Sequence, residues 1–423
     1  MIAVPSETNS VPAASHVVIG AGVIGLSIAY RLARHFDNVL LIDREDPGMA
    51  ASYGNAGHIA TEQVFPLPSP ATLRNAPRLL LGRNGPLSLR GAYVRKIVPW
   101  LLRFAWASRP AAFARGTAAL SDLQGRALDA LRALCVDADV TNQLHERGHL
   151  ILVENPRLAD AAQQQLNTLR QHDISADWVP APGVAELAPG LVGNVGAIYV
   201  RDSAHVGDPL TVSRGLLKAF LNAGGRLLRD EVAGIELGAG GDAATLRLSD
   251  GRLQAQRVVL AAGAWSGPLA AQTGYTLPLD TERGYHVQLP SWTSDLEVAV
   301  ASLDRMTIMT PLQSGLRITG FVELGGLDLP PEPRRLATLN QHLNELLPAA
   351  PPAPRREWMG FRPSLPDHLP VLGVHPQDPR VLYAFGHQHL GLTLAGVTAD
   401  IMLALATGKD PGIDLTPFRI DRF

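Results

Sequence analysis

Three glycines near the start of the chain have a spacing suited to binding phosphate groups. Gly20, Gly22 and Gly25 lie between a short apolar run and a segment with apolar residues at helical spacing, and Asp43 ends the next apolar run. The first glycine would allow a tight turn, the second close approach of a pyrophosphate, and the third close packing of helix on strand. Asp43 could accept a hydrogen bond from a ribose hydroxyl group. The pattern predicts a dinucleotide site, without distinguishing FAD from NAD.

The loop after Asp43 is rich in small residues. It reads "REDPGMAASYGNAGHIA" from Arg44 to Ala60. Small residues are needed where the backbone approaches a ligand closely, as it would at the pyrophosphate and ring of a flavin. Plain surface turns have a similar composition, so the loop alone leaves both interpretations open.

These residues require a βαβ unit to position them. Residues 15–20 and 39–43 are short apolar runs, and residues 23–34 repeat apolar residues at helical spacing. This pattern predicts two parallel strands joined by a helix. Residues 209–225 and 257–265 predict a further helix and a further buried strand of the same sheet.

The remaining segments predict a second domain inserted into the first. Amphipathic helices and alternating strands dominate two intervening segments, and the proline-rich stretch 347–357 marks the expected return to the first domain. We predict an architecture that combines α/β and α+β parts. The Rossmann-type FAD-binding domain comprises residues 1–60, 200–274 and 355–423, and the inserted sheet-and-helix substrate domain comprises residues 61–199 and 275–354.

Composition restricts the function classes. The 423 residues are 46% hydrophobic and carry a formal charge of −2, so nothing indicates a nucleic-acid partner. Cys135 is the single cysteine, which excludes an intramolecular disulfide and a multi-cysteine metal site, and we predict no metal ligands. The first 15 residues resemble a flexible tail more than a secretion signal, and no run of 18 apolar residues lacks a charge. We expect a cytoplasmic protein, soluble or peripheral to the membrane.

Five motifs together resemble one known family. They are the glycine turn with Asp43, "SYGNAG" at 52–57, "AAGAW" at 261–265, "GFRPSLPDHLPVLG" at 360–373 and "GHQHLGLT" at 386–393. In this order they resemble the FAD-dependent amine and amino-acid oxidoreductases, which include D-amino acid oxidase and the glycine and sarcosine oxidases. The "SxxNAG" form is most similar to the bacterial D-amino acid dehydrogenases. The "GHQHLGLT" motif and the loop "NAGHIATEQVFPLPSP" at 55–70 resemble their hydroxyproline-degrading relatives.

The resemblance implies FAD and a set of residues that bind it. We expect the cofactor to be non-covalent, because the sarcosine-oxidase branch attaches its flavin to a cysteine near the C-terminus, whereas Cys135 lies in a helix-like stretch. The expected FAD-binding residues are Gly20, Gly22, Val23, Ile24, Gly25, Asp43, Arg44, Ala51, Ser52, Asn55, Ala56, Gly57, Val232, Ala262, Gly263, Trp265, Gly386, His387, Gly391, Leu392 and Thr393.

The resemblance also implies candidate catalytic residues. The arginine of the family's "GFRP" motif binds the substrate carboxylate, which assigns that role to Arg362, and a planar guanidinium suits bidentate binding. Tyr285, His58 and His387 are weaker candidates, each of which could equally serve packing or local hydrogen bonding. Glu323 is a still weaker one. No acid–base pair is evident, and hydride transfer from a neutral amine to a flavin does not require one.

The function predicted on this basis is oxidation of D-amino acids to imino acids by an FAD-dependent dehydrogenase. Cyclic substrates such as D-proline or cis-4-hydroxy-D-proline are weakly favoured, and a quinone or electron-transfer chain is the expected acceptor. The alternatives are an oxygen-using oxidase of glycine or sarcosine type and a non-catalytic flavin subunit of a hetero-oligomeric dehydrogenase.

Residues 93–110, "YVRKIVPWLLRFAWASRP", could form a basic amphipathic helix in peripheral contact with an anionic membrane surface. The favoured interpretation is a helix that covers the inserted sheet.

Overall fold

The computed structural model describes residues 13–81, 85–238, 241–290, 292, 294–352 and 355–423. The predicted βαβ unit is confirmed: β1 (Ala13–Ile19) and β2 (Val39–Asp43) pair in parallel and are joined by α1 (Val23–Ala33). Most residues of β2 and nearly all of α1 are buried. Continuous apolar runs of this kind are typical of parallel strands covered on both faces.

The first large sheet among the described residues has eight strands. The order along its main path is β10-β2-β1-β13-β12-β11, with β20 paired to β13 and β19 paired to β20. β1, β2, β10, β13 and β20 form the parallel part, and β11, β12 and β19 pair antiparallel. The remaining strands are β10 (Arg226–Arg229), β11 (Gly234–Glu236), β12 (Ala244–Arg247), β13 (Arg252–Leu260), β19 (Val371–Val374) and β20 (Val381–Phe385).

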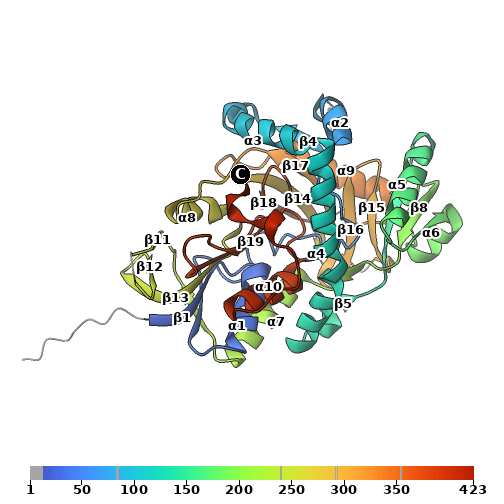
Figure 1. Ribbon diagram of the computed structural model, residues 1–423. Helices are drawn as coiled ribbons and strands as arrows, with labels where there is room; N and C mark the ends of the chain where they lie inside the picture. Colours follow the sequence, from blue (N-terminus) through green and yellow to red (C-terminus); the bar gives the residue numbers. More distant parts are fainter. Residues whose placement is uncertain (1–12, 82–84, 239–240, 291, 293, 353–354) are drawn as a thin grey trace, which may run out of the picture.

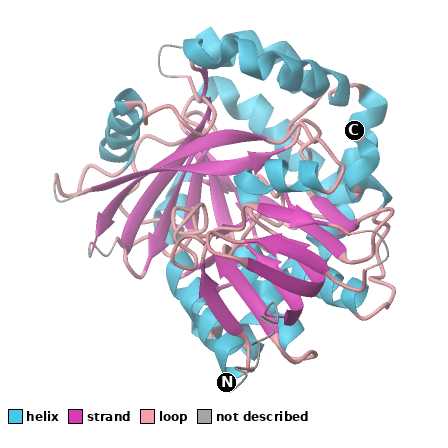
Figure 2. Cartoon of the chain, turned by 90° about the vertical axis from the view of Figure 1, so that its left-hand side faces the viewer, coloured by secondary structure: helices cyan, strands magenta, loops and turns pink. Residues whose placement is uncertain are grey.

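The second large sheet has nine strands and is mostly antiparallel. Its order is β18-β14-β17-β16-β15-β6-β8-β7, with β4 paired to β17. Figure 2 shows the strands of the molecule in two large groups with helices around them. The strands are β4 (Leu87–Leu89), β6 (His149–Val153), β7 (Ala176–Pro180), β8 (Gly196–Val200), β14 (Asp280–Pro290), β15 (Ala299–Ser302), β16 (Thr307–Leu312), β17 (Gly315–Leu324) and β18 (Arg356–Ser364). A small third sheet contains β3 (His58–Ile59), β9 (Ala204–Val206) and β5 (Leu144–His145).

Strand β18 extends the second sheet past the boundary that the prolines suggested. It pairs with β14 in nine-residue register, although residues from 355 onward were assigned to the first domain. The proline-rich stretch follows α9 (Pro333–Leu346) and precedes β18, so it interrupts one domain instead of separating two. The chain returns to the first sheet only at β19. The other predicted domain boundaries stay predictions.

Helices cover the sheets and connect them. Helix α1 packs against α7 and α10, and α10 packs against α4. Helix α4 is the long helix that runs down the middle of the view in Figure 1. The helices other than α1 and α9 are α2 (Pro70–Leu81), α3 (Val94–Ala107), α4 (Pro110–Asp137), α5 (Ala159–Gln171), α6 (Ala181–Leu187), α7 (Pro209–Asn222), α8 (Ser266–Gln272) and α10 (Ala395–Ala406).

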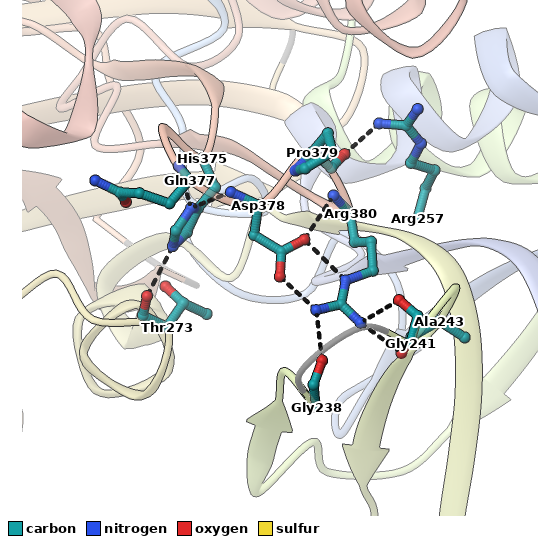
Figure 3. A network of polar contacts seen from close by, with 10 residues as sticks. All are labelled: Gly238, Gly241, Ala243, Arg257, Thr273, His375, Gln377, Asp378, Pro379 and Arg380. Atoms are coloured by element: carbon teal, nitrogen blue, oxygen red, sulfur yellow. Dashed lines mark hydrogen bonds and ion pairs between the residues drawn. The ribbon is translucent and has the colours of Figure 1, made fainter.

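The hairpin of β19 and β20 is anchored to the rest of the first sheet by Arg380. Its guanidinium pairs with Asp378 at 2.6 Å and donates to the carbonyl oxygens of Gly238, Gly241 and Ala243 near the β11–β12 connection (Figure 3). His375, in the same hairpin, contacts the carbonyl oxygen of Thr273 at 2.8 Å. These contacts fix β20, whose C-terminal end leads into the "GHQHLGLT" segment.

The turn between β1 and α1 depends on two glycines. Gly20 has a φ of +104°, and a Cβ atom there would lie 2.5 Å from the carbonyl oxygen of Ala261. A Cβ on Gly25 would lie 1.7 Å from the carbonyl oxygen of Gly20. A Cβ on Gly22 would meet nothing closer than the hydroxyl of Ser52 at 3.4 Å. The fold therefore requires Gly20 and Gly25, and it does not require Gly22.

We predict that Gly25→Ala lowers the free energy of unfolding by about 3 kcal/mol or more, because α1 would have to move away from β1. Thermal and urea unfolding of the FAD-free protein measure this loss. Gly22→Ala, the matched control three residues earlier, should unfold like the unmodified protein. Equal stability of the two variants would contradict the packing described for this turn.

Candidate active site

One cavity of about 1510 Å³ is lined by both large sheets. Its wall includes Gly20, Gly22 and Asp43 from the first sheet's βαβ unit, and Gly284 and Arg362 from strands β14 and β18 of the second. Pockets for drug-sized ligands measure roughly 300–1000 Å³. The cavity therefore has room for a dinucleotide together with a small substrate.

Most of the predicted cofactor residues line this cavity. Those in its wall are Gly20, Gly22, Val23, Ile24, Asp43, Arg44, Ala51, Asn55, Ala56, Val232, Ala262, Gly263, Trp265, Gly386, His387, Gly391 and Leu392.

Four other predicted residues support the wall from behind. Gly25 packs under Gly20 as described, and the hydroxyl of Ser52 accepts a hydrogen bond from Val23 N–H at 2.9 Å. Gly57 has a φ of +77° and donates its N–H to the side chain of Asn55 at 2.7 Å. The hydroxyl of Thr393 accepts a hydrogen bond from Ala60 N–H at 3.0 Å.

The N-terminus of α1 suits an anionic ligand. Gly22 is its N-cap and makes no side-chain capping bond, and the first turn contains no acidic residue. The helix dipole therefore gives this end of the cavity a positive potential. Without a Cβ on Gly22, a phosphate group can approach the backbone. These features fit the pyrophosphate of FAD.

Asp43 is held in place at the end of β2. Its two carboxylate oxygens accept hydrogen bonds from Ala21 N–H at 2.6 Å and Glu45 N–H at 2.9 Å. Each carboxylate oxygen can accept more than one hydrogen bond, so the side chain can still bind a ribose hydroxyl group. Nearby, the guanidinium of Arg44 lies 4.6 Å from the ring centre of Trp265, and both side chains line the cavity.

Arg362 occupies the other end of the cavity. Its Nη1 donates to the carbonyl oxygen of Phe321 at 2.8 Å. The guanidinium lies against Gly284, where a Cβ would come within 2.4 Å of Nη2. Among the described residues, no carboxylate lies within 4.0 Å of Arg362. Burial lowers the pKa of Arg362 and the charge of Glu282 opposes that shift, but an arginine stays protonated. The cavity thus contains a cation that no carboxylate of the described residues contacts directly.

A strained backbone position directs the Phe321 carbonyl toward Arg362. The β14–β17 pairing is irregular between Arg283 and Tyr285, opposite Phe321, whose φ is +66°. A positive φ is rare for an aromatic residue and costs about 1–3 kcal/mol. β-bulges often redirect groups in this way beside functional sites.

Tyr285 does not line the cavity. It is fully buried, donates its hydroxyl proton to Glu323 at 3.0 Å and accepts from Glu332 N–H at 3.0 Å. Side chains alternate across a strand, so Tyr285 faces away from the surface that its neighbour Gly284 presents to the cavity. Glu323 is equally buried and also pairs with Arg283 at 2.8 Å. The expectation that Tyr285 contacts substrate is thus wrong for this geometry.

The two histidine candidates both reach the cavity wall. Burial lowers the pKa of His387 to about 3, so its ring is neutral at physiological pH, and it contacts the hydroxyl of Thr398 at 3.1 Å. His58 places its Nε2 3.2 Å from the carboxylate of Glu62.

Glu62, His149, Glu282 and Gln388 also line the cavity, and none of them was predicted as a site residue from the sequence. His149 lies 91 residues after His58 in the chain. Only the folded arrangement of the sheets and loops brings these residues together.

Comparisons with known proteins agree with this geometry. The family model described as FAD dependent oxidoreductase matches residues 15–405. A D-amino-acid oxidase of Bradyrhizobium diazoefficiens is 32% identical over 423 residues, covering 97% of this chain and 100% of that one. D-amino acid dehydrogenase 2 of Ralstonia nicotianae is 32% identical over 430 residues, covering 96% and 99%.

Solved structures show the same fold. Glycine oxidase from Geobacillus kaustophilus has a TM-score of 0.77 at 22% identity, covering 97% of this chain and 99% of that one. L-proline dehydrogenase from P. horikoshii has a TM-score of 0.74 at 16% identity, with 98% of each chain covered. The predicted combination of a Rossmann-type FAD-binding part with an inserted sheet-and-helix part is confirmed.

We predict that Gly22→Ala folds normally but loses FAD, because the added methyl group would occupy the space of the pyrophosphate. The ratio of flavin absorbance to protein absorbance after purification and dialysis measures the loss. The control is Gly125→Ala on α4, where an added Cβ meets nothing within 4 Å. Full FAD content in Gly22→Ala would contradict this position for the pyrophosphate.

Proposed function

The chain belongs to the family of FAD dependent oxidoreductases, and we propose that it oxidises D-amino acids to imino acids as a dehydrogenase. FAD, when bound, accepts a hydride from the α-carbon of the substrate. The observation that carries the proposal is Arg362, a cation without a carboxylate partner in a cavity that also suits FAD. A non-catalytic flavin subunit would have no use for such a residue.

Arg362 binds the carboxylate of the substrate in this proposal. Phe321 takes one N–H group of the guanidinium, and other N–H groups are left for an anion. Bidentate pairing fixes both the position and the plane of a carboxylate. Such orientation brings the α-hydrogen toward the flavin without a covalent intermediate.

Substrate orientation and electrostatics supply the catalysis in this proposal. His387, with its lowered pKa, is neutral and is not a proton donor at physiological pH. The segment from Gly386 to Leu392 lines the cavity and is proposed to provide backbone donors beside the flavin ring, where reduction increases negative charge.

FAD is proposed to be bound without a covalent link. Cys135 is buried in α4 and does not line the cavity, and burial raises the pKa of its thiol to about 11. It is therefore a packing residue, as expected from sequence. FAD should be released when the protein is denatured.

The electron acceptor is proposed to be a quinone or an electron-transfer chain. The second candidate is an oxidase, because the two relatives at 32% identity are named as an oxidase and a dehydrogenase. Hydrogen peroxide formation in air, compared with reduction of an artificial quinone, distinguishes the two. Cyclic D-amino acids remain within the proposed substrate class.

We predict that Arg362→Ala keeps FAD but lowers kcat/KM for D-amino acids about 100-fold or more, since a buried charge partner is lost. Arg362→Lys should recover only part of the loss, because an ammonium group cannot pair in bidentate geometry. The assay is quinone-analogue reduction with D-alanine and D-proline. Arg356→Ala, an exposed arginine on the same strand, is the control. Full activity of Arg362→Ala would overturn the assignment.

We further propose that α3 contacts an anionic membrane surface, at the cytoplasmic face. Its inner face packs through Ile97 and Trp100, whereas Leu102 and Trp106 are each 67% exposed. Val94 and Val98 extend this exposed apolar stripe, and Arg95, Lys96, Arg103 and Arg109 are exposed beside it. Helix α2 lies at the same edge of the molecule (Figure 1). None of the described helices is long and apolar enough to cross a membrane.

Co-sedimentation with lipid vesicles tests this surface. The protein should bind phosphatidylglycerol-containing vesicles, and Leu102→Ser with Trp106→Ser should weaken binding about tenfold or more, because both side chains lose apolar contact. Leu221→Ser, which removes an exposed leucine from α7, is the control. Equal binding by the double variant would contradict the proposal.

A further inference from the structure

Three side chains that the proposed reaction does not use converge on the cavity wall. His58 begins β3, Glu62 follows in the next turn, and His149 begins β6 in the second large sheet. We call them the His–Glu cluster. All three line the cavity and are buried or nearly so.

The donor atoms of the cluster have the spacing of metal ligands. The Nε2 atom of His58 lies 3.2 Å from Oε1 of Glu62, and the Nε2 atom of His149 lies 3.8 Å from the same oxygen. One ligand atom from each of the three residues falls within 4.8 Å of the others. A tetrahedral zinc ion with bonds of about 2.0–2.1 Å separates its ligands by roughly 3.4 Å. Small side-chain rotations would therefore bring all three donor atoms within bonding distance of one ion.

The electrostatics of the cluster also favour a cation. Glu62 is 6% exposed, and among the described residues no arginine or lysine lies within 4.0 Å of its carboxylate. Its second oxygen, Oε2, has no hydrogen-bond partner there, and neither does Nδ1 of His58 or of His149. A buried carboxylate is costly unless a cation pairs with it, and among the described side chains within 4.0 Å only a protonated His58 or His149 would supply one. A divalent ion would offset that cost.

The donor types narrow the choice of ion. Two imidazoles and one carboxylate suit zinc and its divalent transition-metal neighbours, whereas magnesium and calcium prefer oxygen ligands throughout. Three protein ligands leave at least one coordination position to other molecules.

We propose that the His–Glu cluster binds one divalent transition-metal ion, with Zn²⁺ as the representative ligand, in the wall of the substrate cavity. We predicted no metal ligands because the chain has a single cysteine, and His149 lies far from the other two residues in the chain. Two neighbouring histidines, His205 on β9 and His145 on β5, lie with their ring centres 5.1 Å apart and are outside the ligand set.

Isothermal titration of tag-free, FAD-loaded and chelator-treated protein with ZnCl₂ tests the proposal. We expect one equivalent of Zn²⁺ to bind. Glu62→Gln, which keeps the size of the side chain, should weaken binding more than about 100-fold, since even loss of an outer-shell partner can cost 10–100-fold. His149→Gln should have a similar effect, and the matched control His145→Gln should bind as the unmodified protein does.

A second measurement is independent of activity and of variant stability. Co²⁺ added to the unmodified FAD-loaded protein should give intense visible d–d bands of a low-symmetry site, at longer wavelength than the flavin absorption, and Zn²⁺ should abolish them. Absence of stoichiometric Zn²⁺ binding and of these bands would overturn the proposal. Undiminished Zn²⁺ binding by folded Glu62→Gln and His149→Gln, or equal loss in His145→Gln, would also overturn it.

Discussion

The guanidinium of Arg362 is held by a backbone carbonyl and not by a carboxylate. The rest of the site depends on this neutral hydrogen-bond acceptor. The Phe321 carbonyl fixes the side chain without neutralising its charge. The positive φ of Phe321 costs stability, and the absence of a side chain at Gly284 provides the space in which the guanidinium lies. A carboxylate in place of that carbonyl would form a stable internal ion pair and leave no attraction for an anionic substrate.

The fold brings this cation and the cofactor residues into one cavity by joining two different sheets. The parallel part of the first sheet presents the N-terminus of α1 and the end of β2 to one end of the cavity, as expected for doubly wound sheets. The antiparallel second sheet brings β14 and β18 to the other end. Long strands with continuous pairing keep Arg362 rigid, which is what orientation of a substrate requires.

The cofactor-binding residues could be predicted from local sequence, because the role of each follows from the residues next to it in the chain. The glycine turn, the acid after β2 and the small-residue loop are contiguous signals, and Arg362 was identified through a motif resemblance. Tyr285 was placed in the site by resemblance alone, whereas alternation along β14 turns its side chain toward Glu323 and away from the cavity that Gly284 lines. The His–Glu cluster depends on the approach of β3 and β6, which belong to different sheets and lie far apart in the chain, and one sequence does not reveal such an approach. The prolines before β18 indicated an interruption of regular structure. They did not indicate that the strand after them belongs to the second sheet.

The central claim is that one cavity holds FAD at one end and orients the carboxylate of a D-amino acid at the other. Anaerobic mixing of the FAD-loaded protein with the D- and L-enantiomers of alanine and proline, followed by flavin absorbance, measures this most directly. We expect a D-enantiomer to bleach the oxidised flavin and its L-enantiomer to leave the absorbance unchanged. Absence of bleaching by every D-amino acid, or equal bleaching by the L-enantiomers, would contradict it.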